Sequence, residues 1–179
     1  MREFRLILAA AGVAVVVAGC VFSQNTYIEN SDFDLTLPAF EKSAGPMTLG
    51  VFQNLSGADS RYLCRHRDGR MIKQEYLRWL MAPELLLQRC MYGAFTIDPF
   101  GAEALPRIGC TIFRFEFDES TETAKFSAEF FIERKGNRQV IRVDESEPLK
   151  GELTGASGAV AMSACVNRAV NELKGALKK

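Results

Sequence analysis

The chain has 179 residues, of which 22 are basic and 22 acidic, so its formal net charge at pH 7 is zero. This balance argues against a nucleic-acid-binding surface and against a polybasic membrane patch, since both need an excess of Lys and Arg. The length suits a single domain, and 13 phenylalanines predict a core rich in aromatic side chains.

The N-terminus has the pattern of an exported, lipidated protein. Arg2 and Arg5 precede an apolar run over 6–16, which is too short to span a hydrocarbon core of ~30 Å. The sequence Val-Ala-Gly-Cys then ends at Cys20. It resembles the lipobox of bacterial lipoproteins, in which the cysteine sulfur carries a diacylglyceryl group and the new amine is acylated after cleavage.

We therefore expect a signal peptide over 1–19, a lipidated tether over 20–31 and one periplasmic domain over 32–179. Two or more acyl chains give stable anchoring. Val21 and Phe22 stand where an Asp favours inner-membrane retention in enterobacteria. The periplasmic face of the outer membrane is therefore favoured, with the inner membrane as the alternative.

Alternation of apolar and polar residues predicts short strands over 33–37, 47–52 and 61–65. Residues 72–91 carry apolar side chains at helical spacing, so the first helix is expected there. Pro83 lies inside this range, and its ring predicts a kink or a restart of the helix.

The centre of the chain predicts a β-hairpin. Phe113, Phe115 and Phe117 are expected to share one face of the first strand, and alternate residues over 126–132 form the matching face of the second. A further strand is predicted over 139–143.

An Ala-rich final helix is predicted over about 155–178. Strands, helix, strands and helix thus follow one another along the chain. This order favours an α+β fold, a single two-layer domain whose mostly antiparallel or mixed sheet has both helices packed on one face.

Four further cysteines follow Cys20, and an even number in an oxidising compartment permits two disulfides of unknown pairing. They are Cys64, Cys90, Cys110 and Cys165. The alternative is four buried thiols, since a free cysteine packs as a small apolar residue. No Cys-x-x-Cys occurs and His66 is the only histidine, so no metal site is expected.

Catalytic motifs are missing from the sequence. A Ser or Cys nucleophile needs a base, and His66 is the only histidine available. No Gly-x-Ser-x-Gly elbow or phosphate-binding loop occurs. The chain is therefore not expected to be an enzyme or to need a cofactor beyond the lipid on Cys20. A periplasmic enzyme whose site has no recognisable motif is the least favoured alternative.

The segment that holds Tyr76, Arg78, Trp79 and Pro83 is the candidate partner-binding site. Trp, Tyr and Arg are enriched at interface hot spots. The competing interpretation places Trp79 and Tyr76 in the core and leaves Arg78 in solvent.

An ordered set of motifs resembles the ABC-type transport auxiliary lipoproteins. The final Asn167-Arg168-Ala169 and the Phe-rich hairpin also look like this family, whereas the loop over 96–107 and the cysteines depart from it. In chain order the set is Cys20, Leu35-Thr36-Leu37-Pro38, Leu49-Gly50-Val51, the strand from Arg61-Tyr62 to Arg67-Asp68, and Arg78-Trp79-Leu80-Met81-Ala82-Pro83.

The resemblance implies a role beside transporters of the mammalian-cell-entry type, which move phospholipid or other hydrophobic molecules across the periplasm. The implied partner is their periplasmic substrate-binding protein, and formation of a homo-oligomer stays open. The alternative is a structural outer-membrane lipoprotein of an assembly or secretion complex, because residues 51–57 are faintly similar to secretion-associated periplasmic folds.

Overall fold

The computed structural model describes residues 30–36, 42, 46–101 and 105–178. The signal peptide, Cys20 and most of the tether lie outside the described residues, as do Leu37 and Pro38. The elements are β1 (Ser31–Phe33), β2 (Pro46–Asn54), β3 (Arg61–Arg65), β4 (Met71–Trp79), α2 (Pro83–Ala94), β5 (Thr96–Ile97), β6 (Arg107–Asp118), β7 (Thr123–Arg134), β8 (Asn137–Pro148) and α3 (Gly155–Leu177).

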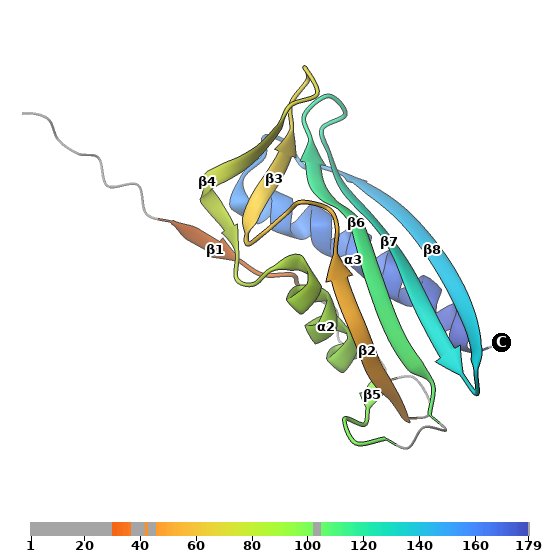
Figure 1. The fold of residues 1–179 in the computed structure, drawn as a ribbon. Helices are drawn as coiled ribbons and strands as arrows, with labels where there is room; N and C mark the ends of the chain where they lie inside the picture. The colour runs from red at the N-terminus through yellow and green to blue at the C-terminus, as the bar shows by residue number, and fades with distance from the viewer. Residues whose placement is uncertain (1–29, 37–41, 43–45, 102–104, 179) are drawn as a thin grey trace, which may run out of the picture.

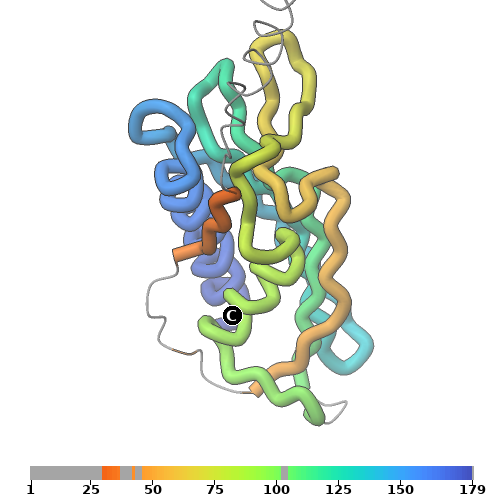
Figure 2. The backbone as a smooth tube through the Cα atoms, turned by 90° about the vertical axis from the view of Figure 1, so that its left-hand side faces the viewer, coloured from red at the N-terminus to blue at the C-terminus, as the bar shows by residue number. Residues whose placement is uncertain are grey.

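These elements form one α+β domain of two layers, so the expected fold class is confirmed. Its eight described strands make one mixed sheet (Figure 1). Helix α3 runs along β7 and β8, and α2 packs against β2 and touches α3. Figure 2 shows both helices on the same side of the sheet. The other side, which we call the outer face, carries no helix from the described part of the chain.

Strand β6 is the centre of the sheet. One edge pairs antiparallel with β7 along its whole length. The other edge pairs parallel with β2 as far as Ile112, and then with β3, where Cys64 lies opposite Phe117. Strands β2 and β3 therefore follow each other along one edge of β6, and the loop between them connects the two halves of the sheet.

An irregularity in β6 changes which residues face the helices. Ile112 lies opposite Ala128 but Arg114 lies opposite Ser127, so Phe113 is an extra residue, as in a β-bulge. The even-numbered residues up to Ile112 are buried, and after the bulge Phe115 and Phe117 are buried instead; the even-numbered set is Ile108, Cys110 and Ile112.

The prediction that Phe113, Phe115 and Phe117 share one face is therefore wrong for Phe113. Its side chain is 42% exposed, whereas those of Phe115 and Phe117 are each 1% exposed. Alternation in the sequence cannot show an inserted residue, because the bulge depends on how the neighbouring strand pairs.

The predicted helix over 72–91 is also wrong in its first half. Residues 71–79 form β4, which pairs antiparallel with β3 and parallel with β1. Pro83 begins α2 rather than kinking it, because a proline at the first helical position loses no helix hydrogen bond. The irregular pairing between β3 and β4 explains why the apolar residues of β4 do not alternate simply.

The first strand begins and ends earlier in the chain than the predicted range 33–37. Strand β1 covers Ser31–Phe33, so it begins within the expected tether. The chain then leaves the sheet toward α3, where the backbone N–H of Thr36 donates to Ser163 Oγ at 2.8 Å. The helix predicted over 155–178 is confirmed as α3, and Thr154 caps it by accepting a hydrogen bond from the N–H of Ser157.

Arg168 of α3 holds the free edge of the sheet. Its guanidinium lies 2.5 Å from Glu145 Oε2 and 2.7 Å from Glu147 Oε2, and both carboxylates belong to β8. It also donates to the backbone carbonyl of Ser146 at 2.9 Å. Among the described strands β8 pairs with β7 alone, so these bonds cover part of an edge that would otherwise be open.

The bulge predicts unequal costs for two similar substitutions. Phe115→Ala should lower the free energy of unfolding by about 3–5 kcal/mol, since it leaves a cavity in the core. Phe113→Ala should change it by less than about 1 kcal/mol, because the side chain is already partly in solvent. Urea unfolding followed by circular dichroism measures both. Equal costs would contradict the register of β6.

Candidate functional site

Trp79 lies at the centre of an aromatic cluster in the core. Its side chain is 1% exposed, and its ring centroid lies 4.3 Å from that of Tyr62 and 5.2 Å from that of Phe115. The hydroxyl of Tyr62 donates to the carbonyl of Gly155 at 2.8 Å, which ties the cluster to the start of α3. Trp79 therefore joins the two layers and presents no surface to a partner.

The other three candidate partner-binding residues do not form a helix face with Trp79. Tyr76 and Arg78 lie on β4, and Pro83 is buried at the start of α2. Tyr76 is 38% exposed. Arg78 is half-buried, and its Nε has no hydrogen-bond partner within the described part of the chain. Of the four residues, only Tyr76 and part of Arg78 are accessible on the surface.

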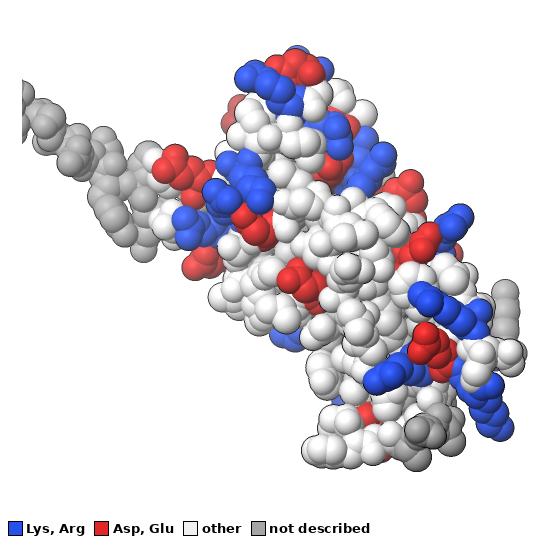
Figure 3. Space-filling model, in the orientation of Figure 1, with Lys and Arg blue, Asp and Glu red and all other residues white. Residues whose placement is uncertain are grey.

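The outer face of the sheet carries the larger exposed apolar surface. Val51 is 80% exposed, Leu55 57% and Val140 46%, and Phe113 adds its half-exposed ring. In Figure 3 this face shows a broad uncharged band over β2, β6 and β7, with charged groups gathered at its two ends. Contiguous apolar surface of this kind with a polar border is typical of interaction sites.

Gly50 and Gly109 line a hollow of about 540 Å³ on this face. A Cβ on Gly109 would lie 2.9 Å from the carbonyl oxygen of Val51, so β2 and β6 approach each other there as only a glycine allows. The ring of Phe131 lies under the guanidinium of Arg138, 4.0 Å from its centroid, and both line the same hollow as Gly50. The hollow thus joins an apolar floor to a cationic wall.

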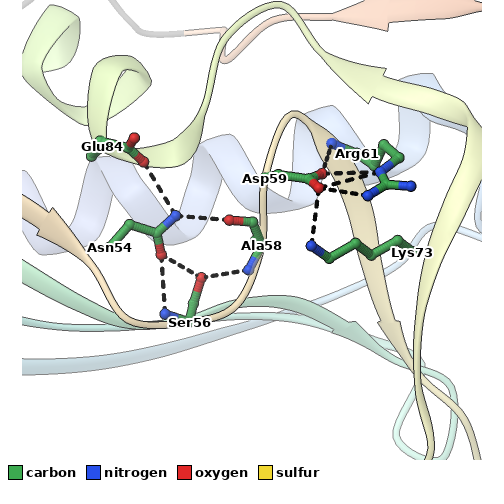
Figure 4. A network of polar contacts seen from close by, with 7 residues as sticks. All are labelled: Asn54, Ser56, Ala58, Asp59, Arg61, Lys73 and Glu84. Carbon is green, nitrogen blue, oxygen red and sulfur yellow. Dashed lines mark hydrogen bonds and ion pairs between the residues drawn. The ribbon is translucent and has the colours of Figure 1, made fainter.

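The loop between β2 and β3 is fixed by a polar network (Figure 4). Asn54 accepts hydrogen bonds from the N–H of Ser56 at 3.0 Å and from its hydroxyl at 2.7 Å. Its amide donates to the carbonyl of Ala58 and to Glu84 Oε2 of α2. Asn54, at the end of β2, therefore positions Leu55 and connects the outer face to α2.

Asp59 extends the same loop toward β4. Its carboxylate accepts from the Arg61 guanidinium at 2.7 Å and from Lys73 Nζ at 2.9 Å. These bonds, that of Arg61 above all, hold the pKa of Asp59 well below its usual range. The charges are satisfied within the network, so they fix the loop rather than offering a reactive group.

A second polar cluster lies on the outer face where β3, β6 and β7 meet. Glu116 is 2% exposed and accepts from Arg65 at 2.9 and 3.2 Å. Asp118 accepts from Lys125 at 2.7 Å and from the hydroxyl of Ser120 at 2.5 Å. The bond from Lys125 is the main cause that lowers the pKa of Asp118. Both carboxylates are paired with a cation, which favours a structural role.

Each of the four described cysteines is a buried free thiol. They lie on separate elements: Cys64 on β3, Cys90 on α2, Cys110 on β6 and Cys165 on α3. Burial raises the pKa of Cys90 and of Cys165 to about 12, and it raises those of Cys64 and Cys110 as well. A thiol without thiolate character is a poor nucleophile. Of the two alternatives from the sequence, buried apolar thiols describe this structure.

His66, the only histidine, lies in the turn between β3 and β4. Its Nδ1 is 2.9 Å from Glu119 Oε2 in the turn between β6 and β7. Within the described ranges, no group of three or more His, Cys, Asp or Glu side chains is placed to hold a metal ion. No helix among those residues is long and apolar enough to cross a membrane.

Comparison with known proteins finds likeness in fold. No protein-family model and no curated protein matches the chain. The solved structure of an uncharacterized protein aligns with a TM-score of 0.69 at 9% identity, over 83% of this chain and 99% of that one. Protein XCC0632 from Xanthomonas campestris, which carries the family designation DUF330, aligns with a TM-score of 0.63 at 14% identity, over 82% of this chain and 94% of that one.

The state of the cysteines can be tested by thiol titration. In the native protein carrying Cys20→Ala, a thiol reagent at pH 8 should react with no cysteine, because the thiols are buried and their pKa values are raised. In urea without reductant, all four remaining cysteines should react. Two or fewer reactive thiols in urea would show a disulfide that the structure does not contain.

Proposed function

We propose that the chain is a non-catalytic lipoprotein of an ABC-type transport system of the mammalian-cell-entry type, which moves phospholipid or other hydrophobic molecules across the periplasm. Lipids on Cys20 anchor it, and it docks the transporter at the outer membrane. The observation that carries this proposal is the lipobox at Cys20 followed by the ordered motifs that resemble auxiliary lipoproteins of such systems.

The positions of the motif residues support this proposal. Tyr62 and Trp79, from two separate motifs, pack against each other with their ring centroids 4.3 Å apart. Leu35, from a third motif, is 5% exposed in the same core, and Pro83 begins α2. Three of the motifs thus contribute side chains to one packed core, which supports treating them as one ordered set.

The groups on which hydrolytic or redox chemistry would depend have structural partners. His66 pairs with Glu119, and the buried carboxylate Glu116 pairs with Arg65. The four described thiols are buried. The outer face of the sheet, in contrast, has exposed apolar residues that neither described helix covers, which supports a role in binding a protein.

The anchor is tested by substitution of the cysteine. Cys20→Ala should abolish incorporation of radioactive palmitate and release the domain from membranes, because no acyl chain can then be attached. Labelling in cells followed by membrane fractionation measures both. A conservative control, Cys165→Ala, should leave labelling unchanged. Labelling that survives Cys20→Ala would contradict the lipobox.

The docking surface is tested by placing a charge on each layer. Val51→Lys on the outer face should reduce co-purification of a mammalian-cell-entry-type substrate-binding protein by at least about tenfold, since it buries a cation in an apolar contact. Val160→Lys is the matched control, because Val160 is 53% exposed on α3. Both variants should keep the wild-type melting temperature.

Equal co-purification by wild type and Val51→Lys would overturn the outer face as the docking surface. Tyr76→Ala and Arg78→Ala would then test the exposed part of β4. Failure of every variant and of the wild type to retain such a partner, with proteins of an assembly or secretion complex recovered instead, would overturn the transport role.

A further inference from the structure

One end of the domain presents a phenylalanine almost entirely to solvent. Phe100, in the turn after β5, is 94% exposed, the highest value of any large apolar residue that the structure describes. Its backbone N–H donates to Asp98 Oδ1 at 3.0 Å, which holds the turn. A ring that buries almost none of its surface contributes nothing to the core, so the fold does not explain it.

Basic residues surround the same end. The turn at Pro99 and Gly101 and the turn between β7 and β8 line a single hollow, which has one acidic lining residue, Glu133. Its basic lining residues are Arg107, Arg134, Lys135 and Arg138, and all four are exposed. Figure 3 shows Lys and Arg atoms gathered over this part of the sheet. We call Phe100 and these four residues the basic end.

Within the described ranges none of the four cations takes part in an ion pair, although Glu133 lines the same hollow. Arg138 lies over the Phe131 ring, which orients the guanidinium without reducing its charge. Helix α3 also ends here, since Ala176 and Leu177 share a hollow with Arg134 and Arg138.

The even balance of charge in the sequence argued against a polybasic membrane patch, and the fold corrects this interpretation locally. Arg107 begins β6, whereas Arg134, Lys135 and Arg138 surround the next hairpin turn. The pairing of β6 with β7 brings Arg107 opposite Glu133 and so places all four cations at one end. Net charge does not reveal such a cluster, because it ignores which segments meet.

We propose that the basic end docks on an anionic phospholipid surface. Phe100 enters the interface between head groups and acyl chains, and the four cations contact phosphate oxygens. An exposed aromatic ring beside clustered Lys and Arg matches the two components of such a surface, one apolar and one negatively charged. A bilayer offers both within a few ångströms of each other.

The choice of a membrane as the occupant rests in part on the proposed anchor. Nine residues lie between Cys20 and Asn30, where the described domain begins, and the ten steps along the chain span at most ~36 Å. An anchored domain is therefore always close to lipid, and a second contact with the same surface is intramolecular. Even a weak affinity of the basic end would then orient the domain and set which face points into the periplasm.

The contact can be tested without the anchor. All buried core residues that the structure describes lie between Leu35 and Leu173, so a chain that begins at residue 20 and carries Cys20→Ser keeps this core. In sedimentation with vesicles, this protein should bind phosphatidylcholine vesicles containing phosphatidylglycerol at least about tenfold more than pure phosphatidylcholine vesicles. Raising the salt concentration should weaken the binding.

Matched variants separate the basic end from overall charge. R134E/K135E should lower binding by at least about tenfold, and Phe100→Ala should lower it several-fold. R67E/R70E makes the same change of charge in the turn between β3 and β4, at the other end of the domain in Figure 1, and should have little effect. Equal losses in the two charge variants, or equal binding to both kinds of vesicle, would overturn the proposal.

A fluorescent reporter locates the contact. Trp79 is the only tryptophan and is buried, so Phe100→Trp adds one exposed reporter to a constant background. Vesicles with brominated acyl chains should quench this variant, whereas Leu55→Trp on the outer face should not be quenched. Quenching of Leu55→Trp alone would place the lipid contact on the outer face and overturn the proposal. Palmitate labelling tests the anchor independently of all these outcomes.

Discussion

The extra residue at Phe113 determines which side chains of β6 enter the core. Before it, β6 buries even-numbered residues next to β2; after it, odd-numbered residues pack next to β3. Phe115 and Phe117 thereby meet Trp79, and the ring centroid of Phe117 lies 5.0 Å from that of Tyr62. If β6 kept a regular alternation through Phe113, with no bulge, the same strand would turn Glu116 toward the helices. The aromatic cluster that joins both layers depends on this single irregularity.

Elements whose apolar residues recur at one regular spacing were predictable from the sequence. The helix over 155–178 and the alternation of 126–132 each have one clear period, and both lie close to the observed elements. The segment 72–79 was misassigned because a strand with irregular pairing can show apolar residues three or four positions apart. Pro83 followed by Glu84 was a usable signal, since both favour the first turn of a helix.

The candidate site was less predictable, for a physical reason. Trp79 was singled out by residue type, but its burial depends on Tyr62 and Phe115, which are distant in sequence. Val51 and Val140 alternate within their strands like core residues, and nothing local reveals that both described helices cover the opposite face. No motif or periodic spacing in the sequence singled out Phe100. Exposure is a property of the tertiary arrangement, so residue type and periodicity cannot supply it.

Arg168 has a consequence for how any partner can bind. Strand β8 is a long edge, and an uncovered edge invites another chain to add a strand through its backbone. The Arg168 guanidinium donates a hydrogen bond to the carbonyl of Ser146. It also forms ion pairs with the two flanking glutamates of β8. Under the anchoring that we propose, copies held on one membrane would meet one another far more often than copies in solution. By covering part of this edge, Arg168 favours recognition through side chains and hinders the addition of a strand from another copy.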